Sequence, residues 1–294
     1  MYDKMKINYV INNEKNVLEI CKDKLNISSR LFTKLKNEHI YLNGELLNTY
    51  HPLNHGDILT IDFGYEEIQD NIVSNPNIKL DILYEDDWLL IVNKPPFLPV
   101  HPTMRHYEST LSNGVKAYYE QIGLKKKIRP VNRLDKNTSG IVIFAKCEYI
   151  QEELTKQMKN NIFQKHYIAL VNGNLPIDNE IKTIDTPIKR KSDSIIERIV
   201  SLDGEKAITK YKVIKNYKDY SELEIRLLTG RTHQIRVHFQ SIGHPILGDS
   251  LYGKKSDLIE RQALHANKSS FYHPITKQLI EIEATIPNDI RALL

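Results

Sequence analysis

The sequence has few of the residues and runs that mark several classes of protein. It contains only 2 cysteines in 294 residues, and Cys21 and Cys147 are too far apart to form a CxxC pair. Neither a disulfide framework nor a structural zinc site is therefore expected. The longest apolar runs, such as 88–92, are too short to cross a bilayer, and the first residues lack the apolar stretch of a secretion signal. We expect a cytoplasmic protein that does not associate with membranes.

Signals for cofactors are also missing. The sequence has no glycine-rich nucleotide loop and no cluster of metal ligands. His233 and His238 have neither HExxH spacing nor a nearby cysteine pair, so we expect them to pack or to form hydrogen bonds. The sequence predicts that the protein uses no cofactor and no metal.

Neither sign of charge is in large excess. Lysine and arginine number 41 against 37 acidic residues, which gives a formal net charge of +4. Local clusters matter more than this balance, because phosphates are neutralised by neighbouring cations. Two basic clusters are present, Lys125, Lys126 and Lys127 in the first and Lys189, Arg190 and Lys191 in the second. Either cluster can be a solvated surface or an RNA contact.

The length fits two units, since a domain usually has roughly 100–200 residues. Residues 1–64 are expected to form the smaller unit. It has a basic segment over 28–36 with helical spacing, which carries Arg30 and Lys34. A strand over 40–44, ending in an Asn-Gly turn, and a second strand over 58–63 follow. The polar residues 65–78 are expected to form a linker.

Residues 79–294 are rich in strand patterns. The apolar runs 89–92 and 141–145 are typical of strands that are buried on both faces. Further strand-like segments, several of them alternating, cover 167–171, 207–213 and 223–227, and helices are predicted over 151–160 and 232–242. The fold class predicted from these patterns is α+β, with a mixed, largely antiparallel sheet and flanking helices.

The first candidate site is the polar segment 130–140, which runs directly into the buried strand predicted over 141–145. A rigid strand that positions a polar loop is a common basis for an active site. From the residues alone, Asp135 can be a catalytic carboxylate, or it can close an Asx-turn with the amide of Lys136 or Asn137.

The second candidate site is segment 229–239. Ile235, Phe239 and Ile242 are spaced as on one face of a helix, which we expect to begin near Thr232 and to end at Gly243. Arg231 would then lie at the start of this helix, where the helix dipole disfavours a cation. We therefore expect Arg231 to face an anion, either a carboxylate or a phosphate.

Taken together and in this order, the segments resemble the RluA-type pseudouridine synthases over nearly all of residues 80–289. The matching segments are 84–86, 91–96, 100–102, 133–140, 165–170, 206–207, 229–238, 243–249 and 264–266. Asn132 departs from the family, which usually has histidine before the arginine of the catalytic loop; we expect changed loop contacts there and unchanged chemistry. Residues 1–64 resemble an S4-like RNA-binding domain, with a plain structural α+β cap as the alternative.

The resemblance implies a reaction that detaches uracil from ribose, turns it, and rejoins it through carbon 5. It implies that Asp135 is the catalytic carboxylate, which either attacks covalently or removes a ribose proton to give a glycal. Arg231 is expected to pair with Asp135 and keep it ionised. Tyr167 is implied to lie against the uracil and to help transfer the carbon 5 proton. Without the resemblance, Tyr167 is a core aromatic residue of a strand.

The resemblance also implies that the partner is structured RNA, either ribosomal or transfer RNA, from which the target uridine is flipped out. Arg133 is expected to fill the gap or hold the backbone, with a structural salt bridge as its alternative. The remaining predicted RNA contacts are Asn132, Arg30, Lys34, Lys125, Lys126, Lys127, Lys189 and Arg190. We expect a monomer without an obligatory protein partner. The rival interpretations are a catalytically silent RNA-binding protein and a carboxylate-based nucleoside hydrolase.

Overall fold

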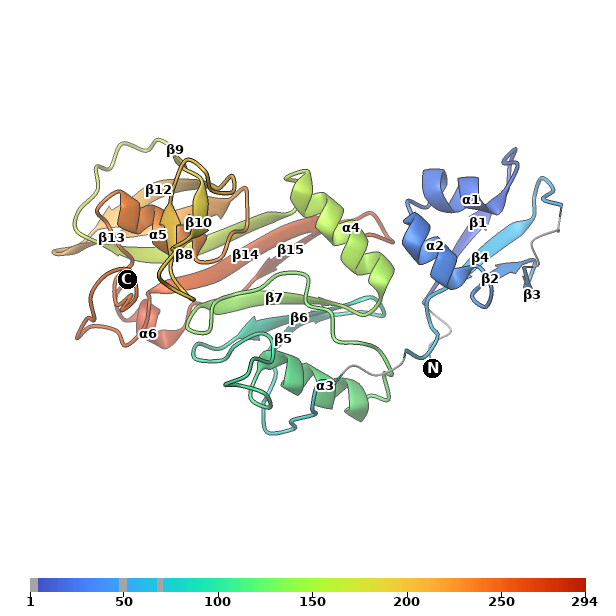
Figure 1. Cartoon of the computed structure of the whole chain (residues 1–294), viewed down its shortest axis with the longest axis horizontal. Coiled ribbons are helices and arrows are strands. Elements are labelled where there is room, and N and C mark those ends of the chain that lie inside the picture. The colour runs from blue at the N-terminus through green and yellow to red at the C-terminus, as the bar shows by residue number, and fades with distance from the viewer. Residues whose placement is uncertain (1–4, 48–51, 68–70) are drawn as a thin grey trace.

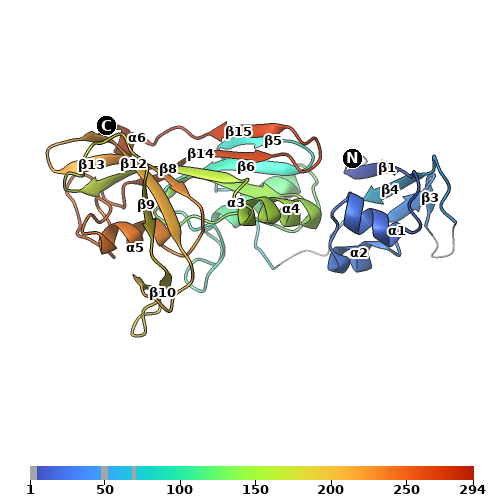
Figure 2. The ribbon, with the colours of Figure 1, turned by 90° about the horizontal axis from the view of Figure 1, so that it is seen from above.

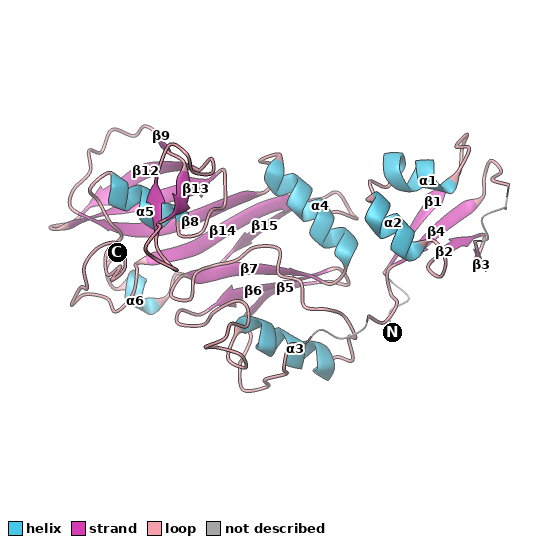
Figure 3. Ribbon diagram, in the orientation of Figure 1, coloured by secondary structure: helices cyan, strands magenta, loops and turns pink. Residues whose placement is uncertain are grey.

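The computed structural model describes residues 5–47, 52–67 and 71–294. Within these residues a small N-terminal unit lies beside a larger unit that is built on a nine-stranded sheet (Figure 1). Strands dominate the larger unit, and helices are few (Figure 3). The predicted α+β class is confirmed.

The N-terminal unit is a four-stranded antiparallel sheet with strand order β1-β4-β2-β3. Its elements are β1 (Lys6–Val10), α1 (Val17–Glu19), the π-helical turn η1 (Ile20–Lys24), α2 (Ser29–Leu35), β2 (Ile40–Leu42), β3 (Glu45–Leu46) and β4 (Ile58–Asp62). The helix predicted over 28–36 is α2, whose first turn is capped by the Ser28 hydroxyl. Asn43 and Gly44 both have positive φ, as a tight hairpin turn requires, and they join β2 to β3 as predicted.

The large sheet has strand order β5-β6-β7-β14-β8-β13-β12-β9, and β15 pairs with β14. Its strands are β5 (Ile82–Glu85), β6 (Leu89–Lys94), β7 (Ser139–Ala145), β8 (Gln164–Asn172), β9 (Lys182–Asp185), β12 (Ile208–Asn216), β13 (Tyr220–Leu227), β14 (Leu264–Tyr272) and β15 (Leu279–Glu283). In the described part of the chain β7 and β14 run parallel, whereas the other pairs in this sheet run antiparallel.

Four helices and a short ribbon complete the larger unit in the described residues. The helices are α3 (Leu111–Gln121), α4 (Glu148–Lys159), α5 (Gln234–Ser241) and α6 (Asn288–Arg291), and the ribbon is β10 (Ile188–Arg190) with β11 (Arg198–Val200). Figure 2 shows this ribbon projecting away from the main sheet beside α5. The helix predicted over 151–160 is α4, which begins three residues earlier than expected, with Cys147 at the N-cap position.

The central strand β7 is buried on both faces, as its apolar sequence predicted. Val142 and Phe144 share a core cluster with α3, whereas Ile141 and Ile143 share another with α4. Because successive side chains of a strand point to opposite faces, α3 and α4 must cover opposite faces of the sheet. This double cover makes β7 a rigid base for the loop that precedes it.

Helix α3 was missed in the sequence because Asn113 and Gly114 are poor helix formers. Both have a tertiary role. The Asn113 side chain accepts from the Thr110 amide at 3.0 Å and closes the N-terminus of the helix. A side chain at Gly114 would collide with Ile78, so glycine allows that segment to pack closely on the helix. Tertiary contacts therefore outweigh local propensity here.

Helix α4 lies at the end of the larger unit that is nearest the N-terminal unit (Figure 1). Apolar and polar contacts join the two units there. Phe63 stacks on Tyr149 with ring centroids 5.2 Å apart, and the Tyr149 hydroxyl donates to the carbonyl of Leu25 at 3.0 Å. Glu67, within the expected linker, is buried and pairs with Arg129. These contacts fix the N-terminal unit against one end of the larger unit.

The parallel contact between β7 and β14 depends on Gly140. This residue has φ of 116°, which favours glycine, and a Cβ there would overlap the backbone of Ala266. We expect Gly140→Ala to reduce the free energy of unfolding by at least about 3 kcal/mol, because strain and steric overlap add. Gly123→Ala is the matched control: φ is 71° there, but no atom lies within 4 Å of the added carbon. Equal losses in urea melts of both variants would contradict this assignment.

His265 lies at the same junction and predicts a pH dependence of stability. Its ring contacts the Ser139 hydroxyl at 2.9 Å, and burial lowers its pKa to about 4. The unfolded chain, with an ordinary histidine pKa near 6.5, binds the proton more readily, so stability falls as pH drops from about 6.5 to about 4. The expected loss is about 3 kcal/mol of unfolding free energy. In the His265→Gln variant this loss should be absent, so the unfolding free energies of wild type and variant, measured against pH, should diverge between about pH 6.5 and 4. If the two pH profiles ran parallel, the role of His265 would be contradicted.

Candidate active site

The loop that carries Asp135 is tied to the sheet through Asn132. The Asn132 side chain donates to the carbonyl of Ile141 at 3.0 Å and accepts from the amide of Ile143 at 2.9 Å. The backbone carbonyl of Asp135 accepts from the Thr138 amide at 3.0 Å, which closes the turn. Because both polar atoms of the Asn132 amide are occupied by β7, Asn132 holds the loop in place. Asn132 also lines the cavity, and its contact with RNA stays a prediction.

Two buried cations bind carbonyl groups of the same loop. The Lys94 ammonium, at the end of β6, donates to the carbonyl of Lys136 at 3.1 Å. The Arg261 guanidinium donates to the carbonyl of Asn137 at 3.0 Å and pairs with Asp289 at 2.6 Å. Burial lowers the pKa of Lys94 to about 7. These contacts leave the loop little freedom, which favours a preorganised site.

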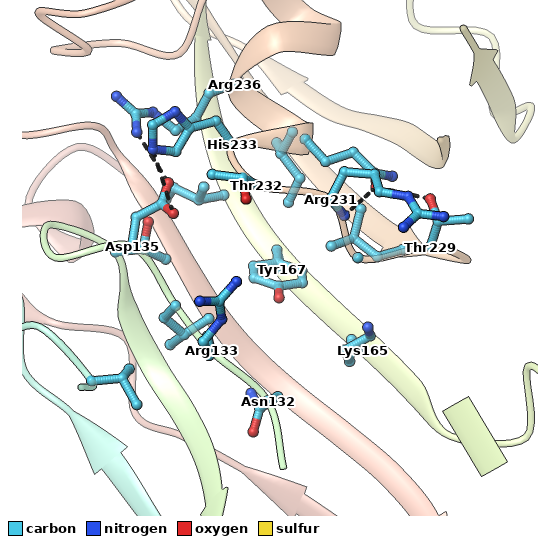
Figure 4. A pocket seen from close by; sticks show the side chains of 18 of the residues that line it. Asn132, Arg133, Asp135, Lys165, Tyr167, Thr229, Arg231, Thr232, His233 and Arg236 are labelled. Atoms are coloured by element: carbon cyan, nitrogen blue, oxygen red, sulfur yellow. Dashed lines mark hydrogen bonds and ion pairs between the residues drawn. The ribbon is translucent and has the colours of Figure 1, made fainter. Parts of the chain in front are cut away.

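The Asp135 carboxylate faces α5 and accepts a hydrogen bond from Arg236 Nη1 at 3.0 Å (Figure 4). Its other oxygen lies 3.8 Å from His233 Nε2. About a quarter of the Asp135 side chain, 26%, is exposed, so the carboxylate remains accessible. Within the described residues the carboxylate forms no bond with the amides of Lys136 or Asn137. The Asx-turn alternative is thereby excluded.

Arg236 is itself fixed by a second carboxylate. Its Nε and Nη2 donate to the two oxygens of buried Asp249 at 2.7 and 2.8 Å, which is a bidentate pair. Burial by itself lowers the pKa of Arg236, but the hydrogen bonds to Asp249 and Asp135 raise it above its ordinary value. The guanidinium therefore stays charged, with one N–H directed at Asp135.

The prediction that Arg231 pairs with Asp135 is wrong. Arg231 Nη1 lies 3.3 Å from Glu205, and its Nε donates to the carbonyl of Lys206 at 3.0 Å. The physical reason is that α5 begins later in the chain than predicted. His233 has φ of 59° and is the N-cap, so α5 begins at Gln234 and not near Thr232. This turn leaves Arg231 outside the helix and places Arg236 on the face toward the loop.

Tyr167, on β8, lies in the cavity between the Asp135 loop and segment 229–233 (Figure 4). Its side chain is buried, and burial raises the pKa of the phenol, with a further increase from the negative charge of Asp135. Tyr167 is therefore neutral at neutral pH. A neutral phenol beside a carboxylate offers an aromatic face and a proton that can be transferred.

His233 lies between Asp135 and Tyr252. Its Nδ1 is 2.8 Å from the Tyr252 hydroxyl. Burial lowers the pKa of His233, and the nearby Asp135 only partly offsets this effect. His233 thus contributes a neutral ring at neutral pH, and the positive partner of Asp135 is Arg236.

These groups line a cavity of about 860 Å³, within the usual range of about 300–1,000 Å³ for ligand pockets. Residues from the 130–138 loop, β8 and segment 227–236 form its walls. Arg133 is exposed at its edge and, in the described part of the chain, forms no ion pair that would make it a structural salt bridge. Its guanidinium is therefore available to a ligand.

The basic clusters prove to be heterogeneous. Lys126 is buried, with its ammonium bound to the carbonyls of Phe63 and Tyr65 at 2.5 Å each, so the prediction that it contacts RNA is wrong. It joins the two units instead. Its neighbours Lys125 and Lys127 are exposed, since alternate residues of this extended segment point outward.

Most of the other predicted RNA contacts lie on the surface with acidic neighbours. Lys34 pairs with Glu148 at 2.9 Å, and Arg30 lies 3.7 Å from the same carboxylate with 88% of its side chain exposed. With Lys127 they line a second, open cavity where α2 meets α4. In the β10–β11 ribbon, Lys189 pairs with Asp203 at 2.8 Å, while Arg190 donates to the carbonyl of Ser194 at 3.0 Å.

Three residues in or beside the cavity were not singled out in the sequence: Arg236, Asp249 and Lys165. The available signal for Arg236 was its position within an apolar helical segment, between Ile235 and Val237.

Among the described residues, no group of three or more histidine, cysteine or acidic side chains is arranged to hold a metal. The described helices include none with the length and apolar character to span a membrane.

The chain is similar to several known proteins in sequence and in fold. The family model for RNA pseudouridylate synthase matches residues 88–241. RNA pseudouridine synthase YjbO of Bacillus subtilis is 38% identical over 272 residues, which covers 92% of this chain and 95% of that protein. Ribosomal large subunit pseudouridine synthase D of Neisseria meningitidis is 38% identical over 240 residues, 77% of this chain and 63% of that protein. Human RNA pseudouridylate synthase domain containing 1 has a similar fold, with a TM-score of 0.58 at 24% identity over 70% of this chain and 83% of that one.

The fold brings an arginine-bound carboxylate and a neutral tyrosine into one accessible cavity. The chain belongs to the RNA pseudouridine synthase family. It is an isomerase that acts on RNA.

Proposed function

We propose that this enzyme converts particular uridines of ribosomal RNA to pseudouridine, with Asp135 as the catalytic carboxylate. The observation that carries the proposal is the Asp135–Arg236 pair, 3.0 Å apart at the wall of the cavity that also holds Tyr167. Relatives whose names specify the large ribosomal subunit favour ribosomal over transfer RNA.

In the proposed reaction, Asp135 acts at the ribose. The ion pair with Arg236 fixes the orientation of the carboxylate, which is to attack the anomeric carbon or to remove a ribose proton. The glycosidic bond breaks, the uracil turns, and its carbon 5 bonds to the anomeric carbon, which releases Asp135 in the covalent route and is accompanied by return of the ribose proton in the glycal route. Carbon 5 then loses its proton, and the former glycosidic nitrogen gains one. Tyr167 lies against the base and assists this proton transfer. No atom is added to or lost from the nucleotide overall.

The uridine must leave the RNA stack to reach this cavity. The exposed guanidinium of Arg133, which lies at the cavity edge, is placed to fill the gap or to hold the backbone. We propose that residues 1–64 act as an S4-like RNA-binding unit. Arg30, Lys34 and Lys127 at its junction with α4 would contact phosphates, as would Lys125 and the basic residues Lys189 and Arg190 of the ribbon.

The experiment that tests this function uses purified wild-type protein and Asp135→Ala with unmodified ribosomal and transfer RNA. Pseudouridine is mapped by carbodiimide-dependent stops in primer extension. New stops with the wild type alone would support the proposal and identify the uridine. Stops only in transfer RNA would reject the ribosomal assignment. No stops with either protein would favour a silent RNA-binding protein, and release of uracil from free nucleosides would favour a hydrolase.

A further inference from the structure

Lys165 is a cation of the cavity that the proposed reaction does not use. It lies on β8, two residues before Tyr167, so both side chains point to the same side of the strand. A methyl group at Gly230 would lie 3.4 Å from the Lys165 ammonium, which places this ammonium against the opposite wall, segment 229–231. Figure 4 shows Lys165 beyond Tyr167 as seen from Asp135.

The ammonium of Lys165 has no protein partner. Among the described residues it forms no ion pair and no hydrogen bond, and it is largely withdrawn from solvent. Burial lowers its pKa, and no carboxylate offsets this effect. Two arginines of the cavity wall differ, because Arg236 is neutralised by Asp135 and Asp249, and Arg231 by Glu205. An unpaired cation in a partly desolvated site is costly unless a ligand supplies the anion.

The substrate offers one group with a permanent negative charge, the phosphodiester. Uracil and ribose are neutral before bond breaking, so they cannot offset the charge in the bound state. The position of Lys165 in the cavity also fits a contact with a phosphate. Lys165 lies on the far side of Tyr167 from the Asp135 carboxylate (Figure 4). A phosphate is likewise several bonds away from the anomeric carbon at which Asp135 acts.

We propose that Lys165 binds a backbone phosphate of the flipped nucleotide, or of the linkage next to it, and so positions the ribose over Asp135. This inference rests on the proposed function, because it requires an RNA nucleotide in the cavity. It assigns to Lys165 a role in substrate binding that is distinct from the chemical step.

The test measures steady-state kinetics on a synthetic RNA hairpin that contains the mapped uridine. Lys165→Met keeps the length of the side chain but removes the charge. Since a charge-assisted hydrogen bond is lost, KM should rise on the order of 10- to 100-fold, while kcat changes by less than about threefold. Lys165→Arg should recover most of the affinity. Lys159→Met is the matched control, because Lys159 is an exposed lysine on the same wall and should change KM by less than about threefold.

A second arm identifies the phosphate. Single neutral methylphosphonates replace each phosphate near the uridine, and binding is measured by fluorescence anisotropy in the Asp135→Asn background, which needs no turnover. At one position the substitution should weaken binding by Lys165-containing protein but should not weaken binding further when Lys165→Met is present. Equal weakening of both proteins at every position, or a loss in kcat with unchanged KM, would overturn the inference. Absence of turnover by wild type, in contrast, would reject the proposed function while the binding arm still tests Lys165.

Discussion

Asp135→Asn should lower kcat for pseudouridine formation at least about 1,000-fold while leaving the fold intact. The amide is almost isosteric with the carboxylate, but it can neither attack the anomeric carbon nor accept a ribose proton, so the chemical step loses its reacting group. Binding of the RNA hairpin should change by less than about tenfold, because a neutral amide leaves the rest of the cavity in place. The measurement is single-turnover kinetics beside anisotropy with the same hairpin.

Stability serves as the control for Asp135→Asn. Asp135 is partly exposed, and Arg236 keeps its bidentate pair with Asp249 when Asp135 is changed. The melting temperature should therefore fall by only a few degrees, in the range of about 2–4 °C per kcal/mol for a chain of this size. A variant that keeps more than a tenth of the wild-type kcat would show that another group performs the chemistry.

Arg236→Lys should reduce kcat about 100-fold. Lysine keeps the positive charge but cannot donate in two directions from a planar group, so it cannot pair with Asp249 in bidentate fashion and also direct an N–H at Asp135. The defect should appear in kcat more than in KM, because Arg236 binds Asp135, the carboxylate that we propose to be catalytic. Steady-state kinetics on the hairpin separates the two.

Arg236→Met should be more severe, since it leaves Asp249 buried without its cation. Removing one partner of a buried pair costs about 3–5 kcal/mol of the free energy of unfolding, and urea denaturation measures it. Arg231→Gln is the matched control, because its pair with Glu205 is exposed and does not reach Asp135. It should keep kcat within about threefold of wild type. If Arg231→Gln lost as much kcat as Arg236→Lys, the assignment of roles to the two arginines would be contradicted.

The contrast between Arg231 and Arg236 shows what sequence patterns can and cannot predict in this chain. The helical spacing of Ile235 and Phe239 predicted α5, and the polar segment before the strand over 141–145 predicted where Asp135 would lie. The partner of Asp135 depended on the left-handed conformation of His233, which no periodic pattern encodes. With His233 at the N-cap, Arg231 lies before the helix and Arg236 lies within it.

Contacts between residues distant in sequence also limited the prediction of α3 and of Lys126. Strands such as β7 were predictable because continuous apolar runs are a local signal. In contrast, α3 contains Asn113 and Gly114, and its stability comes from a cap and from close contact with Ile78. Likewise, Lys126 has the sequence context of a surface lysine, yet it is buried by carbonyls of the N-terminal unit that lie 61 or more residues away.

The most direct test of the central claim is the pseudouridine content of ribosomal RNA in cells. A strain that lacks this gene is compared with strains that carry the wild-type gene or Asp135→Asn, and each uridine is mapped by carbodiimide-dependent stops. We expect at least one stop to disappear in the deletion strain, to return with the wild-type gene, and to remain absent with Asp135→Asn at equal protein level. Return of the stop with Asp135→Asn would contradict the claim that Asp135 is the catalytic carboxylate.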